Sequence, residues 1–142
     1  MEAWQHLQPV VDRVIPIAFD RGLDALTPAE RNVFLVWSYP AAINDGGHDS
    51  FFYNCHGDNA HETVQALHDI GSDDFAQLLS RAIDLFPDRY IPRDIEERND
   101  AYQGLPESAT EVIEQLDQEF FALDSGDELL SRLLKYWNGH GA

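Results

Sequence analysis

The chain has 142 residues, 44% of them hydrophobic, which is enough to form one globular domain over residues 1–142 without disulfides or metals. Nine Lys and Arg stand against 26 Asp and Glu, so the formal net charge is −17. Nucleic acid and anionic membranes would repel such a protein, so we expect neither as a direct partner, whereas basic proteins would be attracted. The alternative interpretation is that the charge only maintains solubility or reflects a high-salt habitat.

The first half of the chain shows helical periodicity interrupted by proline and glycine. Pro9 and Pro16 interrupt the first periodic segment, which predicts a helix between them with irregular ends. A second helix should begin after the cap Thr27, which is followed by Pro at the first helical position and by Glu three residues later. We expect Pro40 to kink or divide that helix and Gly46-Gly47 to end it.

The second half of the chain predicts further helices with short connections. Asn59 and Ser72 should cap the two helices that follow an aromatic run, and Gly57 should end that run. We place these helices at about 50–54, 60–70, 73–86, 95–103, 106–123 and 128–138. No alternating strand pattern of useful length occurs. The predicted fold class is therefore all-α, a single compact domain of about seven or eight short helices.

The middle of the chain carries a more specific pattern. The segment Asn44-Asp45-Gly46-Gly47 leads into the aromatic run Phe51-Phe52-Tyr53-Asn54, and Glu62-Thr63-Val64-Gln65-Ala66-Leu67 follows. This combination resembles a family of small acidic helical proteins, long catalogued as a domain of unknown function, that includes a bacterial DNA-mimic protein. The resemblance covers about residues 27–136 and implies an all-helical domain and a DNA-mimic role. His48 stands where we expect the family to have an aromatic residue, a departure that affects local packing more than the fold.

The acidic residues concentrate in the C-terminal third, where Arg98 is the only basic residue of the segment 94–128. Glu107, Glu111 and Glu114 should share one helix face, because they are four and three residues apart. Four helical residues rise by about 6 Å, close to the roughly 7 Å of two phosphate steps on one DNA strand. A row of carboxylates can therefore imitate a row of phosphates, although a solvated helix face has the same pattern. The candidate partner-binding residues are Asp94, Glu96, Glu97, Asp100, Glu107, Glu111, Glu114 and Asp117.

Two other groups of polar residues have the side chains that metal sites or nucleophiles use. The first consists of His48, Asp49, Asn54, Cys55 and His56. Its spacing matches no zinc pattern, so we favour structural roles in a turn and in the core. The second is His61 and His68, which would lie about 10 Å apart along a helix, too far to share one ion. No phosphate-binding loop, dinucleotide fingerprint or nucleophile elbow occurs, so we expect no catalytic residue, cofactor or metal.

We interpret the chain as a binding protein rather than an enzyme. In the sharpest form of this hypothesis, it is a DNA mimic that occupies the DNA-binding surface of a basic protein, such as a bacterial transcription regulator. One alternative is an immunity-like or antitoxin-like inhibitor of a basic nuclease toxin. Another is an unrecognised enzyme with a site near Asn44, Asn54 and His56.

The sequence also bears on location and assembly. The single Cys55 and the lack of a basic and apolar leader at the N-terminus lead us to expect a cytoplasmic protein. The longest apolar runs are far too short to span a bilayer. The identity of the partner and the oligomeric state stay open, with a homodimer among the alternatives.

Overall fold

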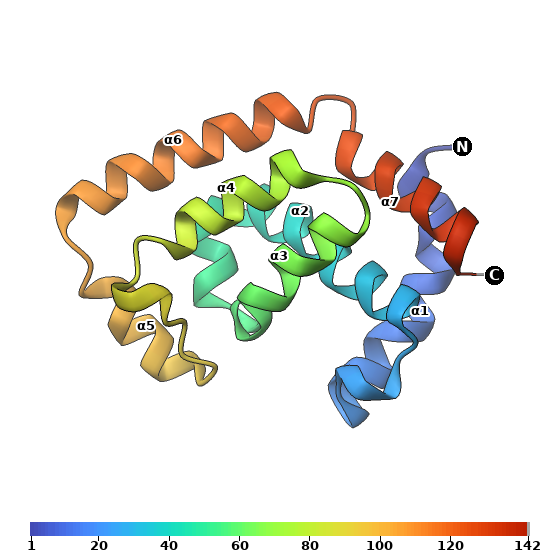
Figure 1. The fold of residues 1–142 in the computed structure, drawn as a ribbon, viewed down its shortest axis with the longest axis horizontal. Helices are drawn as coiled ribbons and strands as arrows, with labels where there is room; N and C mark the ends of the chain where they lie inside the picture. Colours follow the sequence, from blue (N-terminus) through green and yellow to red (C-terminus); the bar gives the residue numbers. More distant parts are fainter. Residues whose placement is uncertain (142) are drawn as a thin grey trace.

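Helices make up most of residues 1–141, the part of the chain that the computed structural model describes (Figure 1). The α-helices are α1 (Ala3–Arg21), α2 (Pro28–Tyr53), α3 (Ala60–Asp69), α4 (Asp73–Ile83), α5 (Ile95–Gln103), α6 (Glu107–Leu123) and α7 (Glu128–His140). Short 3-10 helices lie between some of them, at η1 (Leu23–Ala25), η2 (Cys55–Asn59) and η3 (Pro87–Arg89). No strand occurs within residues 1–141, and the all-α prediction is confirmed.

The long helix α2 lies at the centre of the arrangement. It packs against α1, α3, α6 and α7, while α3 and α4 pack against each other. Helix α6 runs along an outer edge beside α4, and α5 lies at the end of the molecule opposite α1 and α7 (Figure 1). The acidic helix α5 and the start of α6 are therefore neighbours, and they lie far from the N-terminus (Figure 1).

The start of α2 follows the predicted capping pattern. The Thr27 hydroxyl accepts a hydrogen bond from the Glu30 backbone N–H, and the Glu30 side chain accepts one from the Thr27 N–H. The helical backbone continues through the buried Pro40, so Pro40 does not divide the helix, which was one of the two outcomes predicted for it. Its non-helical residues are instead Gly46 and Gly47, where the sequence predicts a break. Gly47 has a φ of 72°, a conformation that costs glycine little.

Helix α1 is longer than the prolines predict. It continues through both Pro9 and Pro16 instead of being confined between them, so that boundary prediction was wrong. The two prolines are seven residues apart and exposed, which places them on the same solvent-facing side of the helix. Carbonyl groups that lose their intrahelical partner on this side can bond to water, so the helix tolerates both residues.

Several boundaries in the second half also differ from the sequence pattern. Asn59 and Ser72 occupy the N-cap positions of α3 and α4, but neither side chain makes a capping hydrogen bond. The aromatic run ends at Tyr53, and Gly57 lies inside η2 rather than terminating the run. Helix α7 extends to His140, beyond the predicted end at 138. Helix α5 has the predicted bounds, between the Asp94 cap and Gly104.

Aromatic side chains fill the core between α2, α4 and α6. The Tyr39 ring on α2 lies 5.7 Å from the Phe51 ring and 5.1 Å from the Phe120 ring, both edge to face. Phe120 in turn lies 5.5 Å from Phe75 of α4. These rings are fully buried and fix α6 against the rest of the molecule. The opposite side of α6 is thereby held toward solvent.

Candidate acidic surface on α5 and α6

Helix α5 is a polar helix that begins at a carboxylate cap. One carboxylate oxygen of Asp94 accepts a hydrogen bond of 3.0 Å from the Glu97 backbone N–H. Acidic residues in the first turn also interact favourably with the partial positive charge of the helix N-terminus. The helix buries only one of its residues, Arg98, so its other charged side chains lie in or near solvent.

Arg98 is completely buried and turns away from the acidic residues around it in the sequence. Its guanidinium donates five hydrogen bonds of 2.7–3.1 Å, and the acceptors are the carbonyl oxygens of Phe52, Asn54, Pro92 and Arg93 and a carboxylate oxygen of Asp58. All five N–H donors of the guanidinium are thus occupied. A Cβ at Gly57 would lie 2.6 Å from Arg98 Nε, so the glycine makes room for this side chain.

Helix α6 separates apolar from acidic residues around its circumference. Its buried side chains are Ala109, Ile113, Leu116 and Phe120, which recur every three or four residues. Glu107, Glu111 and Glu114 are exposed, and at 100° per residue they point away from that buried side. The predicted common face of these glutamates is therefore confirmed, although Val112, which the periodicity also places inward, is 36% exposed.

The carboxylates of α5 and the first half of α6 are not neutralised by basic side chains. We call the eight candidate residues together with the helix faces that carry them the acidic surface. Within residues 1–141, seven of the eight form no ion pair, and these are Asp94, Glu96, Glu97, Asp100, Glu107, Glu111 and Glu114. Because Arg98 is turned inward, the segment 94–117 presents no exposed base of its own. Arg89 and Arg93, which line a pocket with Asp94 and Glu97, are instead paired with Asp84 and Glu62.

Asp117, the eighth candidate, differs from the other seven. It accepts hydrogen bonds from His48, at 2.9 Å from the backbone N–H and at 2.6 Å from ring Nδ1. The other ring nitrogen of His48 lies 2.7 Å from the Tyr39 hydroxyl. A Cβ at Gly47 would lie 2.3 Å from an Asp117 carboxylate oxygen, so the glycine in the turn of α2 leaves room for this carboxylate. Asp117 therefore ties α6 to the turn in α2, and 24% of its side chain stays exposed.

Sequence reasoning missed this buried network. His48 is fully buried beside Tyr39, so the residue that departs from the aromatic pattern still packs in the core as a ring. Burial first, and the Asp117 charge second, raise the pKa of Tyr39 well above its usual value, which keeps the phenol protonated. The signal in the sequence is His48 directly after two glycines, but nothing local identifies Asp117, 69 residues away, as its partner.

A pocket of about 370 Å³ lies between the end of α2, the end of α5 and the first half of α6. Its lining includes the carboxylates of Asp49, Glu114 and Asp117 and the rings of Tyr53 and Tyr102, with no basic residue. The Tyr102 hydroxyl donates to Asp49, and burial, followed by that hydrogen bond, raises the Tyr102 pKa. Carboxylates beside aromatic rings are suited to a guanidinium or ammonium group.

The polar group around the α2 turn is not assembled into one site. His48 faces the core, whereas Cys55 is exposed and lines a different pocket together with His56. Asn54 donates a hydrogen bond of 2.8 Å to the Ser50 carbonyl oxygen, which is the expected structural role. Across residues 1–141, no three His, Cys, Asp or Glu side chains are placed to hold a metal ion together.

The other histidine pair is also divided. His61 bonds through its ring to the Arg89 carbonyl oxygen at 3.0 Å, and His68 pairs with Asp73 at 2.7 Å. Each therefore has its own partner within the chain.

In the described part of the chain, no helix has both the length and the apolar character that crossing a membrane requires.

Comparison with known proteins agrees with the pattern in the middle of the chain. A family model described as "DMP19-like protein" matches residues 24–140, slightly more than the 27–136 that the resemblance covers. No curated protein and no solved structure matches the chain. The family match includes the whole acidic surface and the α2 turn. The chain therefore belongs to the DMP19-like protein family.

Proposed function

We propose that this protein binds a basic protein through the acidic surface and acts as a DNA mimic by occupying the partner's DNA-binding surface. The observation that carries the proposal is the uncompensated charge of α5 and α6, where seven carboxylates lack ion pairs and the single arginine is buried. Membership of the DMP19-like family supports it, because this family includes a bacterial DNA-mimic protein.

The mechanism is competition for one surface. Carboxylates of the acidic surface take the positions of phosphates against lysine and arginine side chains of the partner. The rigid attachment of α6 through Phe120 and Asp117 holds the carboxylate row in place before the partner arrives. Long-range attraction accelerates encounter, so the association rate should fall as the salt concentration rises.

The first experiment is a pull-down from lysate of the source organism. The protein is immobilised at low salt, and bound proteins are eluted with duplex DNA. A basic DNA-binding protein released by the duplex would support the proposal and name the target. A partner that stays bound despite the DNA would instead favour an inhibitor, for example of a basic nuclease toxin. Failure to retain any basic protein would contradict a role for the acidic surface in binding.

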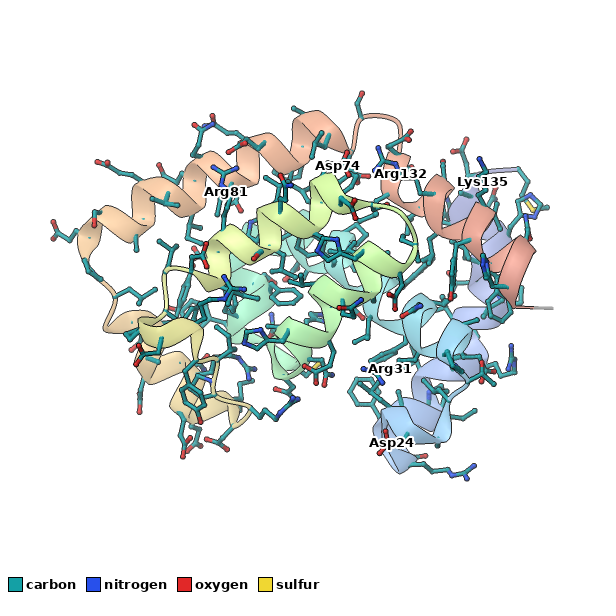
Figure 2. All side chains as sticks on the ribbon, in the orientation of Figure 1. Asp24, Arg31, Asp74, Arg81, Arg132 and Lys135 are labelled. Carbon is teal, nitrogen blue, oxygen red and sulfur yellow. The ribbon has the colours of Figure 1, made fainter. Side chains whose placement is uncertain are left out.

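A matched pair of variants then locates the binding surface. The combined change Glu107→Gln, Glu111→Gln and Glu114→Gln removes three charges from α6 and should weaken binding by about tenfold or more. The control changes Asp12, Asp20 and Asp24 to Asn, which removes the same charge from exposed positions near α1. Figure 2 shows Asp24 on the side of the molecule that holds α1, away from α5. Equal losses in both variants would show that net charge, rather than this surface, governs binding.

A further inference from the structure

A second pocket, of about 500 Å³, shares no lining residue with the acidic surface and has a different chemistry. One wall is the end of α1, the floor is the first half of α2, and the other wall is η2 and the start of α3. In Figure 1 these walls are the lower end of α1 and the segment that leads into α3. We call it the α1–α2 pocket. Its volume falls in the range that small-molecule sites occupy.

The charged groups of the α1–α2 pocket are compensated within the chain. Asp58 and Arg93 are the two charged residues of its lining. Asp58 pairs with the buried Arg98 at 2.9 Å, and Arg93 pairs with Glu62 at 2.8 Å. The acidic pocket of α5 and α6, in contrast, contains three carboxylates and no base. An ionic occupant of the α1–α2 pocket would therefore lose hydration without gaining an unpaired counter-charge.

Three large aromatic rings line the pocket. Phe34 and Trp37 project from α2, and Phe19 projects from α1, with the Phe19 and Phe34 rings 6.0 Å apart and nearly perpendicular. Phe19 is 63% exposed, so a large apolar ring remains in contact with water at the pocket. A flat apolar occupant would cover this ring and gain the free energy of burying it.

His56 supplies a polar group without a partner. Its ring is half-buried, stacks against Phe51 at 6.5 Å, and forms no hydrogen bond within residues 1–141. Burial is the largest cause that lowers the pKa of His56, which favours the neutral imidazole. A neutral imidazole offers one donor and one acceptor to a ligand.

We propose that the α1–α2 pocket binds an uncharged, planar aromatic compound whose rings lie among Phe19, Phe34 and Trp37 and whose polar group hydrogen-bonds to the His56 ring. Such a pocket, mainly apolar with a small number of polar groups that orient the ligand, is the common form of a small-molecule site. This site does not depend on the proposed DNA mimicry, since none of the eight residues of the acidic surface lines it.

Three naphthalene probes with different charge test the proposal on the full chain. They are 2-naphthol, which is neutral at pH 7, the anion naphthalene-2-carboxylate, and the cation 2-(aminomethyl)naphthalene. Binding is followed by NMR through the indole N–H of Trp37. A second readout is the rate at which iodoacetamide alkylates Cys55, the one cysteine of the chain, which lines the same pocket and is exposed. We expect 2-naphthol to bind with a Kd on the order of 0.1 mM, to shift Trp37 and to slow alkylation.

Two variants assign the binding to the pocket. Ala41→Phe adds a ring at an exposed position of the lining and should abolish the Trp37 shift by filling the space. Its control, Ala122→Phe, adds the same ring at an exposed position of α6 and should leave binding unchanged. His56→Phe keeps a ring against Phe51 but removes the hydrogen bond, and it should weaken 2-naphthol binding by about tenfold.

The outcomes separate the proposal from its alternatives. Selective binding of 2-naphthol that Ala41→Phe abolishes and Ala122→Phe leaves intact would establish the site. Equal or tighter binding of the cationic probe would overturn it, because the pocket would then be an extension of the acidic surface. The absence of any Trp37 shift and of any Cys55 protection at millimolar concentrations of all three probes would also overturn it. Neither result bears on partner binding by the acidic surface.

Discussion

Two groups of carboxylates on neighbouring helices of this protein have opposite surroundings. Where α4 meets α6 and α7, Arg81 binds both carboxylate oxygens of Glu119 at 2.9 Å, and Arg132 binds Asp74 at 2.7 Å and Glu128 at 3.1 Å (Figure 2). We call these five residues the arginine seam. The acidic surface on α5 and the first half of α6 shares helix α6 with Glu119, but none of its carboxylates binds an arginine.

A shortage of basic residues does not by itself explain this difference. Arg21, Arg31 and Lys135 form no ion pair within residues 1–141. Figure 2 shows Arg31 and Lys135 at the end of the molecule that holds α1 and α7, away from α5. These unpaired bases therefore lie away from the acidic surface, at an end of the molecule where exposed acids such as Asp12, Asp20 and Asp24 also lie. Asp74 and Glu119 of the seam connect helices, whereas seven of the eight carboxylates of the acidic surface form no ion pair within residues 1–141.

Replacing Arg98 should change stability more than any other substitution considered. It tests whether this arginine, which lies among acidic residues in the sequence, stabilises the interior instead of neutralising them. Arg98→Met leaves four carbonyl oxygens without their donor in the interior and should lower the free energy of unfolding by about 3–5 kcal/mol. The control Arg93→Met removes an exposed ion pair with Glu62 and should cost less than about 1 kcal/mol. Urea denaturation measures both. If both variants lost less than about 1 kcal/mol of unfolding free energy, the buried hydrogen bonds of Arg98 would not be important for stability.

The contrast between Asp117 and Glu114 divides the acidic surface itself. Asp117→Asn weakens two hydrogen bonds to His48 and should lower the free energy of unfolding by about 1–3 kcal/mol. Glu114→Gln, three residues away and exposed, should leave stability nearly unchanged while weakening partner binding. Thermal unfolding and the pull-down assay measure the two effects. If Asp117→Asn left stability unchanged, the hydrogen bonds from His48 would not be important, and Asp117 would resemble the other seven carboxylates of the acidic surface.

Local patterns were sufficient for much of this architecture. The capping sequence at Thr27 predicts the start of α2, and the 3.6-residue periodicity of α6 predicts which glutamates share its outer face. These features depend on residues within one or two helical turns of each other. The prolines of α1 misled the prediction, because their effect depends on which side of the helix faces water.

The division of the carboxylates could not be predicted in the same way. Glu119 and Arg81 are 38 residues apart, and Asp74 and Arg132 are 58 apart, so only the packing of α4 against its neighbours brings them together. Arg98 has the same limitation, because its acceptors are mostly backbone carbonyl groups whose sequence identity carries no signal. The sequence predicts that the C-terminal third of the chain is acidic, and the tertiary structure decides which of its carboxylates form no ion pair.

The arginine seam should weaken in acid, which the pH dependence of Asp74 tests. The hydrogen bond from Arg132 is the largest cause that lowers the Asp74 pKa below its usual value of 3.8. A folded-state pKa below the unfolded one stabilises the protein above pH 3.8. That contribution is lost as the pH falls through the folded-state pKa. Because 39% of the Asp74 side chain is exposed, we expect at most about 1 kcal/mol at pH 7.

The measurement compares urea denaturation of the wild type with that of Asp74→Asn from pH 7 to pH 3. The difference in unfolding free energy should be constant above about pH 5 and should shrink below pH 4. Arg132→Gln removes the same bond from the other side, so the double variant should be less destabilised than the sum of the two single variants. A difference that stayed constant down to pH 3 would show that the ion pair contributes nothing.

The smallest effect has the opposite sign and belongs to the acidic surface. Glu107, Glu111 and Glu114 place like charges at four- and three-residue spacings on α6, which destabilises a helix by about 0.2–0.5 kcal/mol per pair. The double change Glu111→Gln and Glu114→Gln should therefore raise the free energy of unfolding by about 0.5 kcal/mol at low salt. The gain should decline as salt screens the repulsion. Glu119→Gln, on the same helix but bound to Arg81, should give no gain, so equal gains from both changes would erase the distinction between the two groups.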